Sequence, residues 1–106
     1  MGPDTAGGRR GVAVLGATGS IGTSTLNVLR RHRARFRAAV LTARGSAERL
    51  DELALEFEPD YVALAEEPPE GFRPRWAGEW RYGSDSVAEA AGAPRVEIVV
   101  NGLVGV

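Results

Sequence analysis

Three evenly spaced glycines that follow a short apolar run constrain the fold of this chain more than any other feature of its sequence. Residues 12–15 read VAVL, and residues 16–22 read GATGSIG. The apolar run is uncharged and contains β-branched valine, as does a strand buried on both faces of a parallel sheet. The apolar residues after it fall on one helical face, at positions i, i+7 and i+8: Ile21, Val28 and Leu29. The glycines therefore lie at a strand-to-helix turn.

Each glycine of this turn has a separate predicted role. Gly16 permits the tight turn, Gly19 lets a ligand approach the backbone, and Gly22 lets the helix pack close to the strand. Unpaired N–H groups of the first helical turn face that ligand, and the positive end of the helix dipole favours an anion. The hydroxyl groups of Thr18 and Ser20 add hydrogen-bond donors. The spacing is a variant of the dinucleotide-binding pattern G-x-G-x-x-G, so we expect a nucleotide phosphate here; the alternative is a plain loop.

The rest of the chain continues to alternate between strand and helix patterns. Strands are predicted at 37–43, 60–65 and 96–102, and helices at 47–57 and 84–92. The order β-α-β-α-β is the repeating unit of a doubly wound parallel sheet.

The segment between the third strand and the last helix does not follow this alternation. Residues 66–82 are rich in proline and charge, which predicts an irregular connection. Its Trp76 and Trp80 could stack on an adenine ring, but such aromatic residues more often fasten a loop to the body of a domain. The helix after it is predicted to begin with Ser84 as N-cap and to end at Gly92.

These elements predict an α/β, Rossmann-like, doubly wound parallel sheet of about four strands. The first two crossover helices must share one face, because both connections are right-handed and run in the same direction. Only the helix at 84–92 remains for the other face, and the apolar ending GLVGV at 102–106 has nothing after it to bury it. We therefore expect residues 11–106 to be an incomplete domain, the first part of a longer polypeptide, preceded by a disordered tail at residues 1–10.

Composition excludes several classes of function. The chain has 106 residues, a formal net charge of -1 and no cysteine, so disulfides and thiolate metal sites are excluded. The charge does not favour nucleic acid, and no apolar segment approaches the roughly 20 residues that span a bilayer. We expect a cytoplasmic protein with a small-molecule nucleotide as ligand.

No catalytic or metal-ligating set is predicted in this chain. His32 is the only histidine, and no second ligand lies near it in the sequence. The acids of the second helix are interpreted as a solvated face, and the arginines around the end of the first helix as ordinary surface charge. The acids are Glu48, Asp51, Glu52 and Glu56, and the arginines are Arg30, Arg31, Arg33, Arg35 and Arg37.

The end of the second strand indicates which dinucleotide binds. In such folds an acidic residue there holds the ribose 2′-hydroxyl, whereas an arginine accommodates a 2′-phosphate. Here Arg44 offers a guanidinium fork, Gly45 free backbone and Ser46 a hydroxyl, with no acid before Glu48. NADPH is therefore favoured over NADH; the alternative is that Arg44 is a solvated loop charge.

Three segments together resemble a known family. They are GATGSIGTSTLNVLRRHRARFRAAVLTA at 16–43, LALEFEPDYVAL at 53–64 and VEIVVNGLVG at 96–105. They are similar to the N-terminal NADPH-binding region of 1-deoxy-D-xylulose 5-phosphate reductoisomerase. The family departs from this chain after the second strand, where it has Gly, a basic or variable residue and Asn in place of Arg44, Gly45 and Ser46. It also has VGAAG where this chain ends in VGV.

The resemblance implies an enzyme of non-mevalonate isoprenoid biosynthesis that rearranges the carbon skeleton of its substrate and reduces the resulting aldehyde with NADPH. It implies cofactor contacts from Thr18, Gly19, Ser20 and Ile21, with Arg44, Gly45 and Ser46 at the ribose phosphate. It also implies Mg or Mn, whose ligands lie outside this chain with the substrate site, and a homodimer of the full-length protein. The chain alone is expected to be inactive.

Two other functions remain open from the sequence. An NADP-dependent reductase of the extended short-chain type would need a catalytic Tyr-x-x-x-Lys, and this chain has no lysine. A stand-alone nucleotide-binding module without catalysis would leave the apolar GLVGV edge exposed, unless a homodimer covered it.

Overall fold

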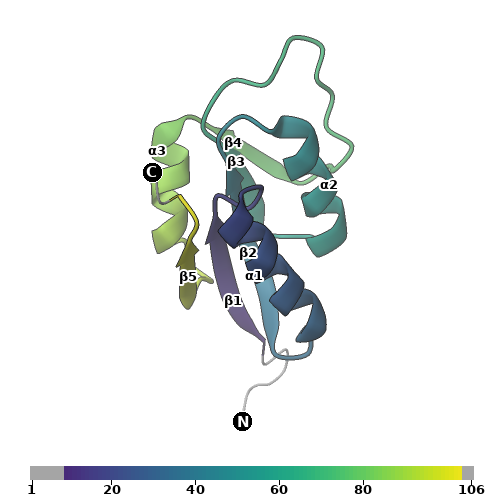
Figure 1. Cartoon of the computed structure of the whole chain (residues 1–106). Coiled ribbons are helices and arrows are strands. Elements are labelled where there is room, and N and C mark those ends of the chain that lie inside the picture. The colour runs from purple at the N-terminus through teal and green to yellow at the C-terminus, as the bar shows by residue number, and fades with distance from the viewer. Residues whose placement is uncertain (1–8, 104–106) are drawn as a thin grey trace.

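Five parallel strands form one sheet in the computed structural model, which describes residues 9–103 (Figure 1). The order of strands across the sheet is β4-β3-β2-β1-β5. The strands are β1 (Arg10–Leu15), β2 (Phe36–Ala43), β3 (Tyr61–Leu64), β4 (Glu79–Tyr82) and β5 (Ile98–Asn101). The helices are α1 (Ser20–Arg31), α2 (Ala47–Phe57), α3 (Ser84–Glu89) and the short 3-10 turn η1 (Ala90–Gly92). The predicted Rossmann-like parallel sheet is confirmed, with five strands where about four were expected.

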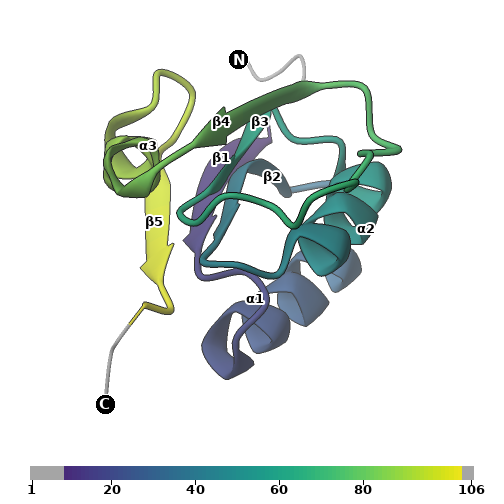
Figure 2. The same cartoon turned by 90° about the horizontal axis from the view of Figure 1, so that it is seen from above.

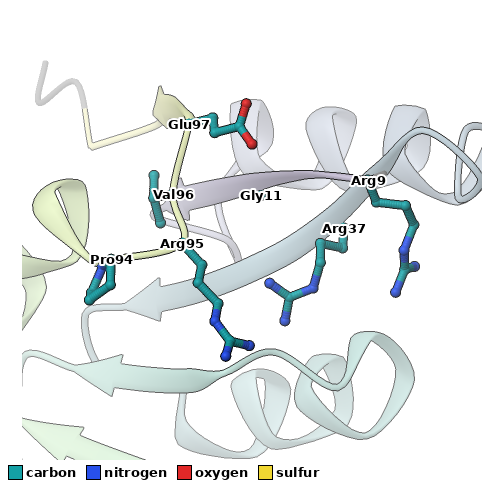
Figure 3. Close-up of a pocket in the computed structure, with 7 residues that line it drawn as sticks. All are labelled: Arg9, Gly11, Arg37, Pro94, Arg95, Val96 and Glu97. Carbon is teal, nitrogen blue, oxygen red and sulfur yellow. The ribbon is translucent and has the colours of Figure 1, made fainter. Parts of the chain in front are cut away.

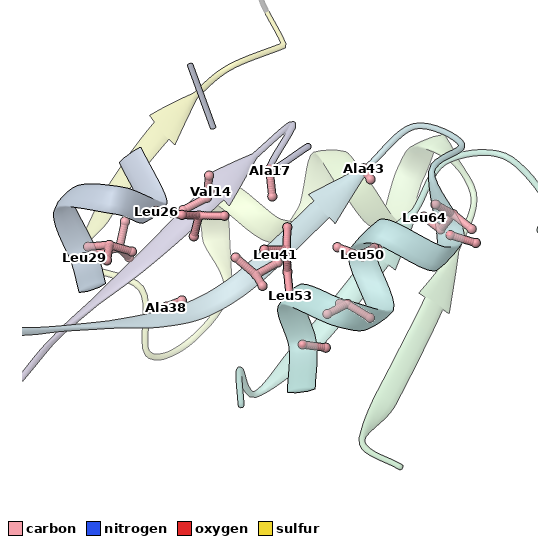
Figure 4. Close-up of a cluster of buried hydrophobic side chains, with 14 residues drawn as sticks. Val14, Ala17, Leu26, Leu29, Ala38, Leu41, Ala43, Leu50, Leu53 and Leu64 are labelled. Carbon is pink, nitrogen blue, oxygen red and sulfur yellow. The ribbon is translucent and has the colours of Figure 1, made fainter. Parts of the chain in front are cut away.

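The helices lie on the two faces of the sheet as the handedness argument predicts. Figure 2 shows α1 and α2 together on one face and α3 on the other. Leu26 of α1 and Leu50 and Leu53 of α2 belong to one buried cluster, in which Leu41 of β2 is fully enclosed (Figure 4). The connection from β4 to β5 runs back across the sheet, so right-handedness places α3 on the opposite face, where Val87 is buried.

β4 corrects the prediction that residues 66–82 are irregular throughout. Its four residues pair in parallel with β3, from Tyr61 opposite Glu79 to Leu64 opposite Tyr82. The strand is short and lies at the sheet edge, so only half of it is shielded from solvent and its apolar signal is weak. The tryptophans fasten the connection, as the commoner interpretation predicted: Trp76 and Trp80 both pack against the main core.

Asp51 corrects the prediction that all the acids of α2 are solvated. Its side chain is buried, and its carboxylate accepts hydrogen bonds from the backbone N–H groups of Arg75 (2.9 Å) and Trp76 (2.9 Å). The guanidinium Nε of Arg75 lies 3.6 Å from the same carboxylate. One acid of α2 thus holds the long connection between β3 and β4 against the helix.

Two further details of the helices differ from expectation. Ile21 and Val28 are each 48% exposed, and the buried face of α1 consists instead of Gly22, Leu26 and Leu29. The N-cap of α3 is Gly83 rather than Ser84, because the chain enters this helix with a φ of 102°, which glycine adopts without strain.

The predicted tail at residues 1–10 consists mainly of residues 1–8, which lie outside the described residues. Residues 104–106 of the apolar ending also lie outside them. β1 begins at Arg10, whose backbone N–H donates to the carbonyl of Arg35.

Candidate functional site

The glycine turn after β1 is held in place by β2. Gly16 has a φ of 78°, which confirms that the turn needs glycine there. Its N–H donates to the hydroxyl of Thr42 (3.0 Å), and the N–H of Ala17 donates to the carbonyl of Thr42 (2.7 Å). Thr42 is fully buried. The sequence analysis did not single out this residue, although a hydroxyl inside an apolar strand is a signal that a buried polar partner is needed.

Gly22 and Gly102 let the start of α1 approach the strand ends. A Cβ at Gly22 would overlap the backbone of Gly16 and Ala17. A Cβ at Gly102 would lie 2.9 Å from the carbonyl oxygen of Leu15 and 3.3 Å from the nitrogen of Gly22. The predicted packing role of Gly22 agrees with this geometry, and Gly102 makes the same close approach from the other side.

Gly19 differs from these glycines because nothing in the described chain requires it. It is exposed, its φ is -85°, and an added Cβ would meet only the Gly16 carbonyl oxygen at 3.6 Å, an ordinary contact. It is the N-cap of α1 and has no side chain to cap the helix. Within residues 9–103, no carbonyl or side chain accepts a hydrogen bond from the N–H groups of Ser20, Ile21 or Gly22. The surface beside Gly19 therefore has N–H donors without described acceptors and room for atoms that are not part of the described chain.

The strand order places this turn at a topological switch point. The chain leaves β1 toward β2 on one side, whereas β5 pairs with β1 on the other, with Leu15 opposite Asn101. Ligands of open α/β sheets bind in the crevice outside the carboxyl ends of the strands where the order reverses. Gly16 and Gly102 lie at that crevice.

The second predicted segment lies at the same edge of the sheet. Ser46 is the N-cap of α2, and its hydroxyl makes no capping hydrogen bond. The Arg44 side chain is 84% exposed, and its Nε donates to Oε2 of Glu66 (2.9 Å). A Cβ at Gly45 would lie 2.7 Å from Oε1 of the same carboxylate. The sequence analysis missed Glu66, because it follows β3 and only the sheet brings it beside Arg44.

A cavity of about 360 Å³ adjoins Arg44 at this edge. Its walls are mostly apolar and come from the ends of β2 and β3, from α3 and from the segment after β5. The lining residues are Ala43, Arg44, Ala65, Ser84, Val87, Ala88 and Leu103. A flat aromatic base suits such walls better than a charged group does.

Another cavity lies at the opposite edge of the sheet, where β1, β2 and β5 begin. It has a volume of about 450 Å³, and three arginines line it: Arg9, Arg37 and Arg95 (Figure 3). Arg37 is paired with Asp60 (2.5 Å). This cavity is separated from the glycine turn by the length of the strands.

The remaining predicted residues form no second site. Among residues 9–103 there is no group of three His, Cys, Asp or Glu side chains that could hold a metal ion. His32 is exposed and caps the end of α1, where Arg30 and Arg33 both pair with Glu56 of α2. None of the helices described is both long and apolar enough to cross a bilayer.

Glu56 and Tyr61, which have displaced pKa values, lie near the amino-terminal edge of the sheet. The hydrogen bond from Arg30 holds the pKa of Glu56 below its usual range. Burial raises the pKa of Tyr61, whose ring lies 3.6 Å from the Arg81 guanidinium carbon. Both groups belong to the packing of neighbouring elements rather than to the crevice.

Comparison with known proteins gives one consistent result. A family model described as 1-deoxy-D-xylulose 5-phosphate reductoisomerase matches residues 12–106. The reductoisomerase of Nitrosospira multiformis is 40% identical over 102 residues, which cover 91% of this chain and 26% of that protein. The reductoisomerase of Nitrobacter winogradskyi is 44% identical over 91 residues, which cover 82% and 22%. The chain thus spans about a quarter of the length of the curated relatives it matches.

Solved structures give the same result. A crystal structure of DOX-P reductoisomerase in complex with NADPH, fosmidomycin and magnesium aligns with a TM-score of 0.73 and 31% identity, over 85% of this chain and 23% of that chain. The Zymomonas mobilis reductoisomerase in complex with NADPH aligns with a TM-score of 0.68 and 32% identity, over 79% and 23%.

Proposed function

Because the chain belongs to the 1-deoxy-D-xylulose 5-phosphate reductoisomerase family, we propose that it binds NADPH as the cofactor-binding part of such an enzyme. One observation carries the proposal: Gly19 is an exposed glycine that the described chain itself does not need, and the N–H groups of the three residues after it have no described acceptor. A bound pyrophosphate would use both features. The family match favours this function over a reductase of the extended short-chain type.

The pyrophosphate of NADPH is assigned to the start of α1. The N–H groups of Ser20 and Ile21 point away from any described acceptor, and the helix dipole adds positive potential there. Thr18 and Ser20 contribute hydroxyls at the rim. Two relatives whose structures align with this chain contain NADPH, which supports the same ligand here.

The adenosine half is assigned to the ends of β2 and β3. The 2′-phosphate would lie against Arg44, Gly45 and Ser46; Ser46 is the N-cap of α2, and its hydroxyl makes no capping hydrogen bond. The adenine would enter the apolar cavity next to Arg44, between Ala65 and Val87. NADPH is favoured over NADH because a guanidinium pairs with a phosphate dianion much more strongly than with a hydroxyl.

The activity of the whole enzyme is part of the proposal. The reaction rearranges the carbon skeleton of 1-deoxy-D-xylulose 5-phosphate and reduces the product, and NADPH supplies the hydride when bound. The residues described here bind and orient that cofactor. Mg or Mn would be held by residues beyond this chain, since residues 9–103 offer no fitting set of ligands. We extend the proposal to a cytoplasmic homodimer of the full-length protein, which light scattering on that protein tests.

The direct test is a titration of this chain with NADPH, followed by the fluorescence of the nicotinamide. We expect Gly19→Val to weaken binding roughly tenfold or more, since the added methyl groups fill the space left for the phosphates. The fold should survive, because valine adopts an extended backbone readily and the site is open.

Gly92→Ala is the matched control, because nothing lies within 4 Å of its added Cβ. Its binding should equal that of the unchanged chain. If Gly19→Val bound NADPH as tightly as Gly92→Ala does, the glycine turn would not be the phosphate site.

A further inference from the structure

Arg44 has an anionic partner within the chain itself. Its Nε lies 2.9 Å from Oε2 of Glu66, and the backbone N–H of Glu66 donates to the Arg44 carbonyl (2.8 Å). The pairing follows from the sheet, since Ala43 and Leu64 are register partners at the ends of β2 and β3. The backbone bond holds Glu66 beside Arg44 even when the side chains separate.

The carboxylate of Glu66 also lies over the backbone of the predicted phosphate segment. Its Oε1 is 2.7 Å from the point where a Cβ on Gly45 would stand, so glycine leaves room for it. A dinucleotide with a 2′-phosphate would bring its charge to this same place. Two anions close to the Arg44 guanidinium repel each other, so each weakens the binding of the other.

The ion pair between Arg44 and Glu66 can separate easily. The side chains of Arg44 and Glu66 are 84% and 56% exposed, so water and salt screen their attraction and little free energy opposes their separation. An exchangeable counter-ion at a ligand site lowers affinity without abolishing it, because the ligand must first displace it.

From this geometry we propose that Glu66 is a specificity-determining residue that moderates the preference of this site for NADPH over NADH. The inference rests on the proposed function. Glu66 competes with the 2′-phosphate of NADPH for Arg44, whereas the 2′-hydroxyl of NADH can donate a hydrogen bond to the same carboxylate. An acidic residue that favours the hydroxyl usually ends the second strand of such a fold. Here the acid reaches the same place from the end of β3.

The test compares NADPH and NADH titrations of the chain and of Glu66→Gln at one low ionic strength. Glu66→Gln removes the charge with little change in shape, so we expect NADPH to bind about three- to tenfold more tightly. NADH should bind equally well or more weakly. Glu67→Gln is the matched control, an exposed acid one residue further along, and should change neither affinity more than twofold.

A second pair of variants tests whether Glu66 acts through Arg44. In an Arg44→Ala background, Glu66→Gln should lose most of its effect on NADPH, which a double-mutant cycle measures. Equal changes for NADPH and NADH in Glu66→Gln, or no change in either, would overturn the inference and leave the cofactor site in place. If the folded, unchanged chain bound neither nucleotide, the proposed function would fall together with the inference.

Discussion

At the scale of single residues, glycine has three distinct purposes within one turn. Gly16 supplies a positive φ, Gly22 supplies the absence of a Cβ against neighbouring backbone, and Gly19 leaves space that no described protein atom uses. The first two purposes concern the stability of the chain, and the third is explained by the ligand that we propose. Substitutions should therefore separate folding from binding.

Gly22→Ala should destabilise the fold. The new methyl group would overlap the backbone of Gly16 and Ala17, which cannot rotate away as a side chain can. We expect a loss of about 1–3 kcal/mol in the free energy of unfolding, as for other overpacked sites. Urea unfolding measures it, and an unchanged midpoint would show that the start of α1 can shift away from β1.

Asp51→Ala should release the connection between β3 and β4 from α2. The backbone N–H groups of Arg75 and Trp76 would lose their acceptor in a partly buried place, at a cost of about 1–3 kcal/mol. Tryptophan emission should move to longer wavelength, since both tryptophans lie in or next to this connection. Glu52→Ala, an exposed neighbour, should leave emission and stability nearly unchanged; a matching shift there would implicate the helix and not the carboxylate.

The spacing of residues along the chain was sufficient to predict the structural roles of Gly16 and Gly22, but not the hydrogen-bond partners of the polar side chains. The roles of Gly16 and Gly22 follow from a strand, a turn and a helix within a few residues. Asp51, Thr42 and Glu66 each act on a segment more than twenty residues away, so their roles depend on which strands become neighbours. The roles of Gly19 and Arg44 in binding stay predictions until the titrations are done.

At the scale of elements, one acid joins the two helices on the same face of the sheet. Glu56 of α2 accepts hydrogen bonds from Arg30 and Arg33 of α1, and both guanidinium groups lie over the ring of Phe57. The hydrogen bond from Arg30 lowers the pKa of Glu56 from its ordinary value of 4.5. The pair therefore stabilises the folded state while the carboxylate is charged.

The contribution of Glu56 should depend on pH in a defined direction. A folded-state pKa below the unfolded value gives stabilisation that is complete above the unfolded pKa and lost as pH falls through the folded pKa. At pH 7 we expect Glu56→Gln to lower the free energy of unfolding by about 0.3–1 kcal/mol, since the pair is partly exposed. Thermal melts should show this difference shrinking below pH 4.5. Glu48→Gln is the control. If the loss of stability in Glu56→Gln were the same at every pH, packing and not charge would explain the effect of Glu56.

The elements that the sequence predicts best are those with a long apolar repeat. β2 and α2 begin and end close to their predicted bounds. The eight residues of β2 and the eleven residues of α2 are long enough for their apolar residues to indicate a strand and a helix clearly. β4 was missed because it has only four residues at a sheet edge, none of them fully buried, after a stretch rich in proline. The buried face of α1 was predicted wrongly because Ile21 and Val28 are apolar and yet exposed.

At the scale of the whole molecule, backbone amides should be protected from hydrogen exchange most strongly at the centre of the sheet and least strongly in β5. β2 has a strand on each side and helices over it, and Val40 and Leu41 are buried almost completely. β5 pairs only with β1 among the described elements, and Val99 is 42% exposed. Hydrogen–deuterium exchange should therefore be at least tenfold slower at Leu41 than at Val99. Equal rates would mean that another segment or a second copy covers β5.

The fold class could be predicted from the sequence because its evidence is repeated along the chain. Each strand-and-helix unit independently favours a parallel sheet, and the handedness of the crossovers then sets which face each helix covers. The edge strand β4 and the pairing between Arg44 and Glu66 could not be predicted in this way. They depend on edges and neighbours that exist only once the sheet has formed.

The pairing of β1 with β5 determines when the proposed phosphate site can form during synthesis. β1, the glycine turn and α1 leave the ribosome first, whereas Gly102, which closes against Leu15 and Gly22, leaves after every other described element. A nascent chain that ends before β5 lacks one wall of the crevice. If the proposed phosphate site is correct, a nascent chain can bind the cofactor only after β5 has been synthesised and has paired with β1.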